Sequence, residues 1–191
     1  MSEKTIYNDL RKAGLTHAGA CGLMGNFKAE SAMKSNIVQR GMQSKSDEDY
    51  TIAFDANPDK YIYDAVGYGL AQWTFWSRKK NLWQFSKNWG VSVGAEDMQT
   101  AFAVWELKNE YTKVWQTLCA TDSVDTAADI VCTQYERPAV NNLVQRRGFA
   151  AEFDRMFKNS QPEQPQYVPM ASLSDIADQL EELAKILRGF K

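Results

Sequence analysis

The chain has 191 residues, enough for one compact domain with a small appendage and too few for a large multidomain protein. Hydrophobic residues make up 44% of the chain and aromatic residues 12%, a composition that excludes disorder as the main state. Lys and Arg number 22 and Asp and Glu 24, so the net charge of −2 lacks the basic excess that binding to nucleic acid requires.

Secretion, membrane and metal signals are also weak. The first residues, MSEKTIYNDLRKAGL, contain no apolar core of a signal peptide, and no later window approaches the roughly 18 apolar residues of a membrane span. The three cysteines have no CxxC spacing, and there is a single histidine, which argues against zinc. We therefore expect synthesis without a signal peptide, no membrane partner, no metal and no cofactor.

The first predicted helix follows Thr16. Its apolar residues at helical spacing are Ala20, Leu23, Met24 and Phe27. Gly19, Gly22 and Gly25 leave one face of this helix almost without side chains. Since an interior glycine costs about 0.5–1 kcal/mol relative to alanine, three of them indicate that another backbone packs closely here.

Glu30 lies at the end of this helix. The negative end of the helix dipole and apolar neighbours such as Phe27 would both disfavour an ionised carboxylate there. A carboxyl that keeps its proton near neutral pH can act as a general acid on an acetal oxygen. The competing interpretation is a solvated glutamate at a helix end.

Residues 31–64 read as a polar, irregular lobe, with an acidic cluster at 47–49 and a short β-prone patch at 61–63. The next segment, 64–73, has the sequence DAVGYGLAQW, in which Gly67 and Gly69 flank Tyr68 and Gln72 precedes Trp73. Glycines that permit close approach, an amide side chain and aromatic rings could together form a carbohydrate cleft. A buried β-hairpin with core aromatics would explain the same pattern.

Helical stripes recur through the second half of the chain. They comprise Met98, Ala101, Phe102 and Trp105; Tyr111, Val114, Trp115 and Leu118; Val124, Ala127, Ala128, Val131 and Tyr135; and Phe149, Phe153, Met156 and Phe157. The third stripe has Ser123 as a predicted N-cap and stops at Pro138. The fold class is therefore mostly α, of the α+β kind, with a helical body and a small irregular or β lobe.

The main domain is predicted to span residues 1–158. Three prolines within 159–171 mark an extended linker. Residues 172–191 then form a predicted amphipathic helix with leucine and isoleucine at heptad-like spacing. This helix could dock on its own domain or mediate self-association or contact with a partner.

Taken together, three segments resemble the phage tail-type lysozyme domains of phage endolysins and tail lysins. They are GACGLMGNFKAES (19–31), DAVGYGLAQWTFWSRK (64–79) and QYERPA (134–139), in that order. The resemblance implies a lysozyme-like fold, with Glu30 as the catalytic acid. It also implies substrate-binding positions at Tyr68, Gly69, Gln72, Trp73, Tyr135 and Arg137.

The second carboxylate remains open at this level. Inverting glycosidases separate their two carboxyls by about 6.5–9.5 Å and retaining enzymes by about 5–5.5 Å, and a sequence gives neither distance. The resemblance favours Asp64, with the acidic residues of the preceding loop as alternatives. A mechanism that uses Glu30 alone, with the substrate's acetamido group as nucleophile or with an anhydro product, also stays open.

Two other chemistries are suggested by spacing. Asp55, Asn57 and Asp59 have part of a calcium-loop pattern, but the glycine and the final glutamate of such a loop are missing. His17 and Cys21 share a helix face, which invites a cysteine peptidase hypothesis. That chemistry usually joins residues from different elements, so a buried thiol is the better interpretation.

We therefore expect a glycoside hydrolase that cuts bacterial peptidoglycan, of muramidase type. The alternatives are an N-acetylglucosaminidase, a lytic transglycosylase, a non-catalytic wall-glycan-binding tail module, and an amidase or peptidase. The expected partner is the peptidoglycan glycan strand. Synthesis in the host cytoplasm would be followed either by holin-dependent release or by delivery from a phage tail.

Overall fold

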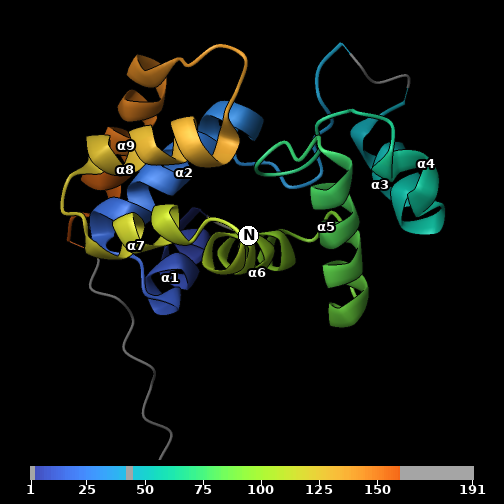
Figure 1. Ribbon diagram of the computed structural model, residues 1–191, viewed down its shortest axis with the longest axis horizontal. Coiled ribbons are helices and arrows are strands. Elements are labelled where there is room, and N and C mark those ends of the chain that lie inside the picture. Colours follow the sequence, from blue (N-terminus) through green and yellow to red (C-terminus); the bar gives the residue numbers. More distant parts are fainter. Residues whose placement is uncertain (1–2, 42–44, 160–191) are drawn as a thin grey trace, which may run out of the picture.

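The computed structural model describes residues 3–41 and 45–159 of the chain, and almost all of its regular structure there is helical (Figure 1). The elements are α1 (Glu3–Ala13), α2 (His17–Ser31), α3 (Asp47–Ala56), α4 (Pro58–Ile62), α5 (Trp76–Trp89), α6 (Glu96–Asn109), α7 (Thr112–Ala120), α8 (Val124–Ile130), the π-helix η1 (Val131–Glu136) and α9 (Leu143–Phe157). The predicted mostly-α fold class is confirmed.

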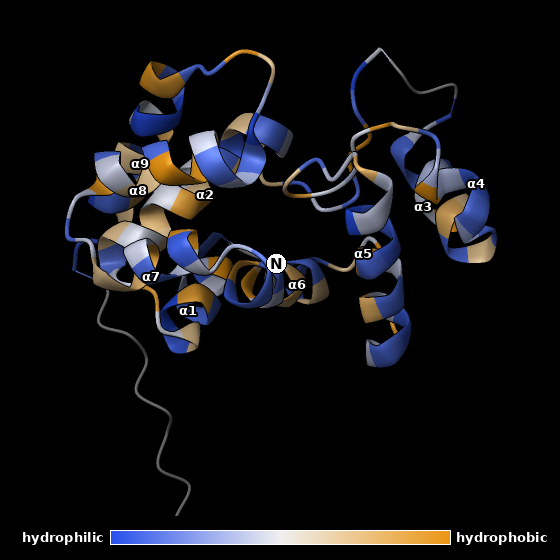
Figure 2. Cartoon of the chain, viewed as in Figure 1, coloured by the Kyte–Doolittle hydropathy of each residue, from blue (hydrophilic) through white to orange (hydrophobic). Residues whose placement is uncertain are grey.

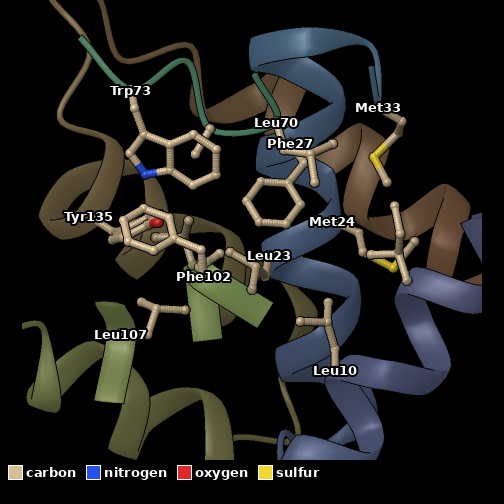
Figure 3. Packing of buried hydrophobic residues seen from close by; sticks show 14 of the residues in the cluster. Leu10, Leu23, Met24, Phe27, Met33, Leu70, Trp73, Phe102, Leu107 and Tyr135 are labelled. Atoms are coloured by element: carbon tan, nitrogen blue, oxygen red, sulfur yellow. The ribbon is translucent and has the colours of Figure 1, made fainter. Parts of the chain in front are cut away.

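Helix α2 forms the centre of the body and contacts α1, α7, α8 and α9. It begins where the sequence predicted, since the Thr16 hydroxyl accepts a hydrogen bond from the backbone N–H of Gly19 at 2.9 Å. Its residues Leu23, Met24 and Phe27 are fully buried and point into the core shown in Figure 3. A helix that is apolar almost all round is a core helix, and α2 fits that description.

The predicted close packing of the α2 glycines is confirmed. A Cβ at Gly19 would lie 2.0 Å from the carbonyl oxygen of Leu118, and one at Gly22 would lie 2.4 Å from the Cβ of Ala127. At Gly25 it would lie 2.7 Å from the backbone nitrogen of Ala150. The three glycines therefore let α7, α8 and α9 approach α2 at backbone distance.

Helices α3, α4 and α5 lie on the opposite side of the molecule from α2, and α6 contacts both α1 of the body and α5 (Figure 1). Figure 2 shows both hydrophilic and hydrophobic residues on α5 and α6, and each helix buries part of its surface. The body and the α3–α5 lobe nevertheless share one continuous hydrophobic core.

The 31–64 segment is more regular than the sequence predicted, because it contains helices α3 and α4. The acidic cluster at 47–49 is the first turn of α3, where carboxylates suit the positive end of the helix dipole and Ser46 supplies the N-cap. The β-prone patch at 61–63 belongs largely to α4, whose first residue is Pro58. The Ser46 cap begins α3, and a proline at the first helical position begins α4, against the β propensity of the aromatic residues.

No strand forms in residues 3–41 and 45–159, where pairing is limited to isolated antiparallel bridges of Tyr68 with Val38 and with Trp73. The β part of the expected lobe is thus reduced to a tight turn. The predicted C-terminal helix and nearly all of the linker lie outside the described residues. Within the described helices, none is both long enough and apolar enough to cross a membrane.

The C-terminal half of the predicted 124–135 helix departs from α geometry. Ser123 caps α8 as predicted, and η1 then carries the chain through a π-helical turn to Arg137, which adopts a left-handed conformation with φ 49° directly before Pro138. Single π-turns inside helices occur frequently at functional sites. Here the turn ends at Glu136 and Arg137, which border the cleft described below.

Candidate active site

A cleft of about 1370 Å³ lies between the helical body and the α5 side of the molecule. Its walls come from the end of α2, residues 37–40, the segment after Gly67, the start of α5, the end of α6 and the end of η1. Polar groups dominate the lining, with Glu30, Glu106, Glu110 and Glu136 among them. Such a cleft is large enough for several sugar rings, because small-ligand pockets measure about 300–1,000 Å³.

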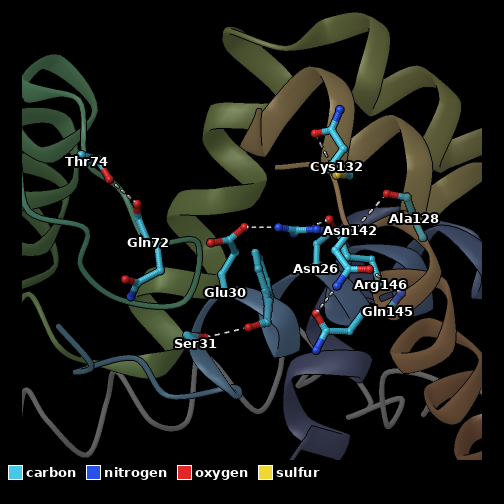
Figure 4. A network of polar contacts seen from close by, with 12 residues as sticks. Asn26, Glu30, Ser31, Gln72, Thr74, Ala128, Cys132, Asn142, Gln145 and Arg146 are labelled. Atoms are coloured by element: carbon cyan, nitrogen blue, oxygen red, sulfur yellow. Dashed lines mark hydrogen bonds and ion pairs between the residues drawn. The ribbon is translucent and has the colours of Figure 1, made fainter. Parts of the chain in front are cut away.

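Glu30 lines this cleft from the last turn of α2, and its side chain is 18% exposed. Its Oε1 accepts a hydrogen bond from Nη2 of Arg146 at 2.5 Å, and Nη1 of the same guanidinium donates to Oδ1 of Asn26 at 2.8 Å (Figure 4). Asn26 is itself fixed by hydrogen bonds to the carbonyls of Gly22 and Ala128. The carboxyl is therefore held in one orientation.

The sequence analysis expected only apolar neighbours around Glu30, and the structure adds Arg146 of α9, which is buried and forms an ion pair with it. The two residues are 116 positions apart. No local pattern in the sequence could have indicated their pairing.

Glu136, the last residue of η1, also lines the cleft. Its Oε1 is buried and accepts no hydrogen bond from the described part of the chain. Burial raises the pKa of this carboxyl well above its ordinary value, and the negative charge of Glu30 raises it further, against the opposing effect of Arg78 and Arg146. The Glu136 carboxyl therefore keeps its proton far more readily than an exposed glutamate.

The sequence analysis quoted Glu136 only as part of a motif and did not consider it as an acid or base. Its position next to Tyr135 and Arg137, both predicted to bind substrate, was the one available signal.

Buried Glu106 joins three segments that the sequence analysis treated separately. Its Oε2 accepts hydrogen bonds from Nε1 of Trp73 at 3.0 Å and from the hydroxyl of Tyr135 at 2.7 Å. Arg78 donates to both carboxylate oxygens at 2.7 Å. Glu106 falls four residues after Phe102, on the predicted apolar stripe of α6, and that misplaced charge was a signal in the sequence.

The structure divides the residues predicted to bind substrate into two groups. Gln72 and Arg137 line the cleft. Tyr68, Trp73 and Tyr135 are 0% exposed and pack in the core, which keeps their rings away from a ligand. The buried-aromatic interpretation of the 64–73 segment therefore describes these rings better than the carbohydrate-cleft interpretation.

The turn after Tyr68 places Gln72. Gly69 has φ 78°, and a Cβ there would lie 2.5 Å from Oε1 of Gln99, so the turn requires glycine. Gln72 itself has φ 44°, and its Nε2 donates to the carbonyl of Gly69 at 3.0 Å. Gly69 thus shapes the cleft wall without lining it.

Asp64 is not among the lining residues of the cleft. It accepts a hydrogen bond from Nζ of the fully buried Lys79 at 2.6 Å, and another from the hydroxyl of Tyr50 at 2.5 Å. Burial lowers the pKa of Lys79, and the hydrogen bond to Asp64 opposes that shift. The geometry gives Asp64 the role of counter-ion to a buried lysine.

The other suggested chemistries find no matching site. Asp55 binds Lys87 and Ser92 through its side chain. Burial raises the pKa of the Cys21 thiol to about 12, so it stays protonated next to His17 and is a poor nucleophile. Across residues 3–41 and 45–159, no group of three or more His, Cys, Asp or Glu side chains could hold a metal ion.

Comparison of the sequence with known proteins identifies a family. The model of the phage tail lysozyme family matches residues 2–157. The chain belongs to this family. It is also similar to Morphogenesis protein 1 of Bacillus phage B103, with 29% identity over 161 residues, covering 78% of this chain and 36% of that protein. The chain thus spans about a third of that relative's length, and membership of the family confirms the predicted resemblance.

Proposed function

We propose that the chain cleaves the glycan strands of bacterial peptidoglycan by glycosidic hydrolysis. The observation that carries the proposal is a polar cleft in which two carboxyl groups, Glu30 and Glu136, experience opposite environments. Glycosidases generally work with a carboxyl pair of which one member holds a proton and the other is charged. Membership of the phage tail lysozyme family supports this reaction class.

Glu30 is proposed as the proton donor to the glycosidic oxygen, in the role that the family resemblance implies. Glu136 takes the place of Asp64 as the second carboxyl, because it lines the cleft and Asp64 does not. The negative charge of Glu30 contributes to the raised pKa of Glu136, so the two carboxyl groups lie close enough to interact.

A second assignment exchanges the two roles. Glu136 would donate the proton, and Glu30 would stabilise positive charge on the sugar ring as a carboxylate. Two observations favour this exchange. Glu30 forms an ion pair with Arg146, and the buried Oε1 of Glu136 accepts no hydrogen bond from the described residues. Both assignments use the same pair and the same cleft.

The first test is the loss of wall lysis in Glu30→Gln. We expect the rate of turbidity loss of purified cell walls to fall at least about 100-fold, the lower range for removal of a catalytic proton-transfer group. Glu110→Gln is the matched control, because Glu110 lines the same cleft but is exposed. Since Arg146 loses its partner, Glu30→Gln should also melt earlier, and circular dichroism must show that it is folded at the assay temperature. Full lysis by folded Glu30→Gln would refute the proposal.

The leaving group of the substrate separates the two assignments. The aryl group of an aryl glycoside leaves as a stable phenolate and needs little protonation. A variant that lacks the proton donor should therefore keep most of its activity on an aryl glycoside. If Glu30 is the donor, Glu30→Gln cleaves an aryl N-acetylglucosamine oligosaccharide far better than it cleaves cell walls. If Glu136 is the donor, Glu136→Gln shows that rescue and Glu30→Gln does not.

Muramidase cleavage is the proposed bond specificity, because lysozyme-like enzymes mostly cut after N-acetylmuramic acid. An N-acetylglucosaminidase would leave the other sugar at the reducing end, and a lytic transglycosylase would leave an anhydro sugar. Mass spectrometry of the reduced digest distinguishes all three products. Release of free amines without new reducing ends would indicate an amidase or peptidase, and binding to walls without any release would indicate a non-catalytic module.

Delivery as part of a phage particle is the proposed route to the wall. The similarity to a phage morphogenesis protein favours it over holin-dependent release. Detection of the chain in purified virions by mass spectrometry would support this route, and its presence only in the lysate would favour release.

A further inference from the structure

Three large aromatic rings gather at the surface next to the cleft. Tyr63 and Phe75 are each 62% exposed and Trp76 is 46% exposed. The ring of Tyr63 stacks on that of Trp76 with centroids 5.9 Å apart, and the rings of Phe75 and Trp76 are 6.0 Å apart. These three residues are called the aromatic platform below.

The platform continues the wall of the cleft. Phe75 is itself a lining residue, as are Thr74 and Ser77 on either side of the Phe75–Trp76 pair. Asn81 lines the cleft one turn further along α5. A flat apolar surface is thus bordered by hydroxyl and amide groups, the combination that binds the apolar face and the hydroxyls of a pyranose ring.

The position of Phe75 at the start of α5 is a second, separate observation. Phe75 is the N-cap residue of α5, and its side chain makes no capping hydrogen bond. Ser, Thr, Asp or Asn at an N-cap stabilises a helix, and phenylalanine gives up that contribution while exposing a large ring to water. A residue that breaks a local stability rule without a compensating contact, as Phe75 does at this N-cap, indicates a functional role.

We propose that the aromatic platform is a glycan subsite that stacks on a sugar ring of the peptidoglycan strand outside the bond that is cut. The proposal rests on the proposed function for its substrate class. Phe75 extends the cleft to the platform, so a strand lying in the cleft would continue across the rings of Phe75 and Trp76. The subsite adds affinity for the strand and does not take part in proton transfer.

The test measures binding of an N-acetylglucosamine hexamer and of purified cell walls to the full chain carrying Glu30→Gln. We expect Phe75→Ala and Trp76→Ala each to weaken binding about threefold to tenfold, the range for loss of one stacking contact. Trp89→Ala is the matched control, because Trp89 ends the same helix and is 47% exposed but does not line the cleft. It should bind within twofold of the parent.

Kinetics on cell walls give a second readout in the chain with Glu30 intact. Loss of the subsite should raise KM more than it lowers kcat, because the contact stabilises bound substrate and transition state alike. Equal binding by the platform variants and Trp89→Ala would overturn the proposal. So would a loss of self-association in Trp76→Ala at unchanged glycan affinity, since a second copy of the chain would then be the occupant.

The outcome is separable from that of the proposed function. A parent chain that binds glycan through the platform but never cleaves it would refute the hydrolase and leave the subsite standing. Cleavage of cell walls by the parent chain, with the same KM in the platform variants, would support the hydrolase and refute the subsite.

Discussion

At the scale of single residues, the carboxyl groups around the cleft differ in whether a cation accompanies them. Ion pairs hold two of these carboxylates, Glu30 with Arg146 and Glu106 with Arg78. Among the described residues no cation forms an ion pair with Glu136. A buried carboxyl without a cation is more stable neutral, so Glu136 should make folding stability depend on pH.

The sign of that dependence follows from the raised pKa of Glu136. Below about pH 4.5, its ordinary value, the carboxyl is protonated in both the folded and the unfolded chain. As the pH rises above that value, the unfolded chain releases the proton while the folded chain retains it, so folding stability falls. Glutamine cannot ionise and escapes this loss. We therefore expect Glu136→Gln to raise Tm at pH 7 by about 2–4 °C, the shift that roughly 1 kcal/mol produces at this size.

Thermal melts at pH 7 and pH 4 check this expectation. The gain should shrink at pH 4, and Glu110→Gln, which removes an exposed carboxyl from the same cleft, should leave Tm unchanged at both values. A gain of equal size at both pH values would mean that the glutamine stabilises by packing and that Glu136 has no raised pKa.

At the scale of helices, α2 determines how closely the body can pack. Its glycines bring the backbones of neighbouring helices close enough for Asn26 to reach the carbonyl of Ala128 at 3.0 Å. Arg146 of α9 reaches both Asn26 and Glu30 across the same contact. The glycine face therefore positions the carboxyl at the end of its own helix.

Gly22→Ala tests this packing against helix propensity. Alanine gains about 1 kcal/mol of propensity inside a helix. Its Cβ would however lie 2.4 Å from the Cβ of Ala127 and 2.7 Å from the backbone nitrogen of Ala128, and relieving such overpacking typically costs about 1–3 kcal/mol. Because backbone atoms cannot move aside as a flexible side chain can, the clash should outweigh the gain, and Tm should fall.

Gly148→Ala in α9 is the matched control, since a Cβ there would meet nothing within 4 Å. It should raise the free energy of unfolding by up to about 1 kcal/mol, measured by urea denaturation of both variants. Stabilisation by Gly22→Ala would show that the helices separate easily and that the glycines do not fix their distance.

At the scale of the whole molecule, the sequence predicts contacts that are local and misses those that are distant. The caps at Thr16 and Ser123 and the close packing at the α2 glycines follow from neighbouring residues, and the structure confirms them. Arg146 and Glu106 meet their partners across 116 and 28 to 33 positions. Spacing carries no information on such pairs, so the polar framework of the cleft became visible only in the folded chain.

Glu106 connects the two walls of the cleft through these distant contacts. On one side it holds Trp73 and Arg78, which belong to the turn segment and to α5. On the other side it holds Tyr135, the neighbour of Glu136 on η1. Removal of a buried charge that several donors share strongly destabilises the folded protein. The cation left behind, here Arg78, then has no counter-ion.

Glu106→Gln should therefore lower the free energy of unfolding by about 3–5 kcal/mol, the cost of breaking a buried ion pair from one side. It should also loosen both walls together, since Arg78 and Tyr135 lose the same anchor. Hydrogen exchange should become faster in residues 66–78 and 131–137 in this variant. Glu110→Gln, at the exposed C-cap position that follows α6, should leave exchange in both segments unchanged. Faster exchange confined to α6 would show that the two sides of the cleft are held independently of Glu106.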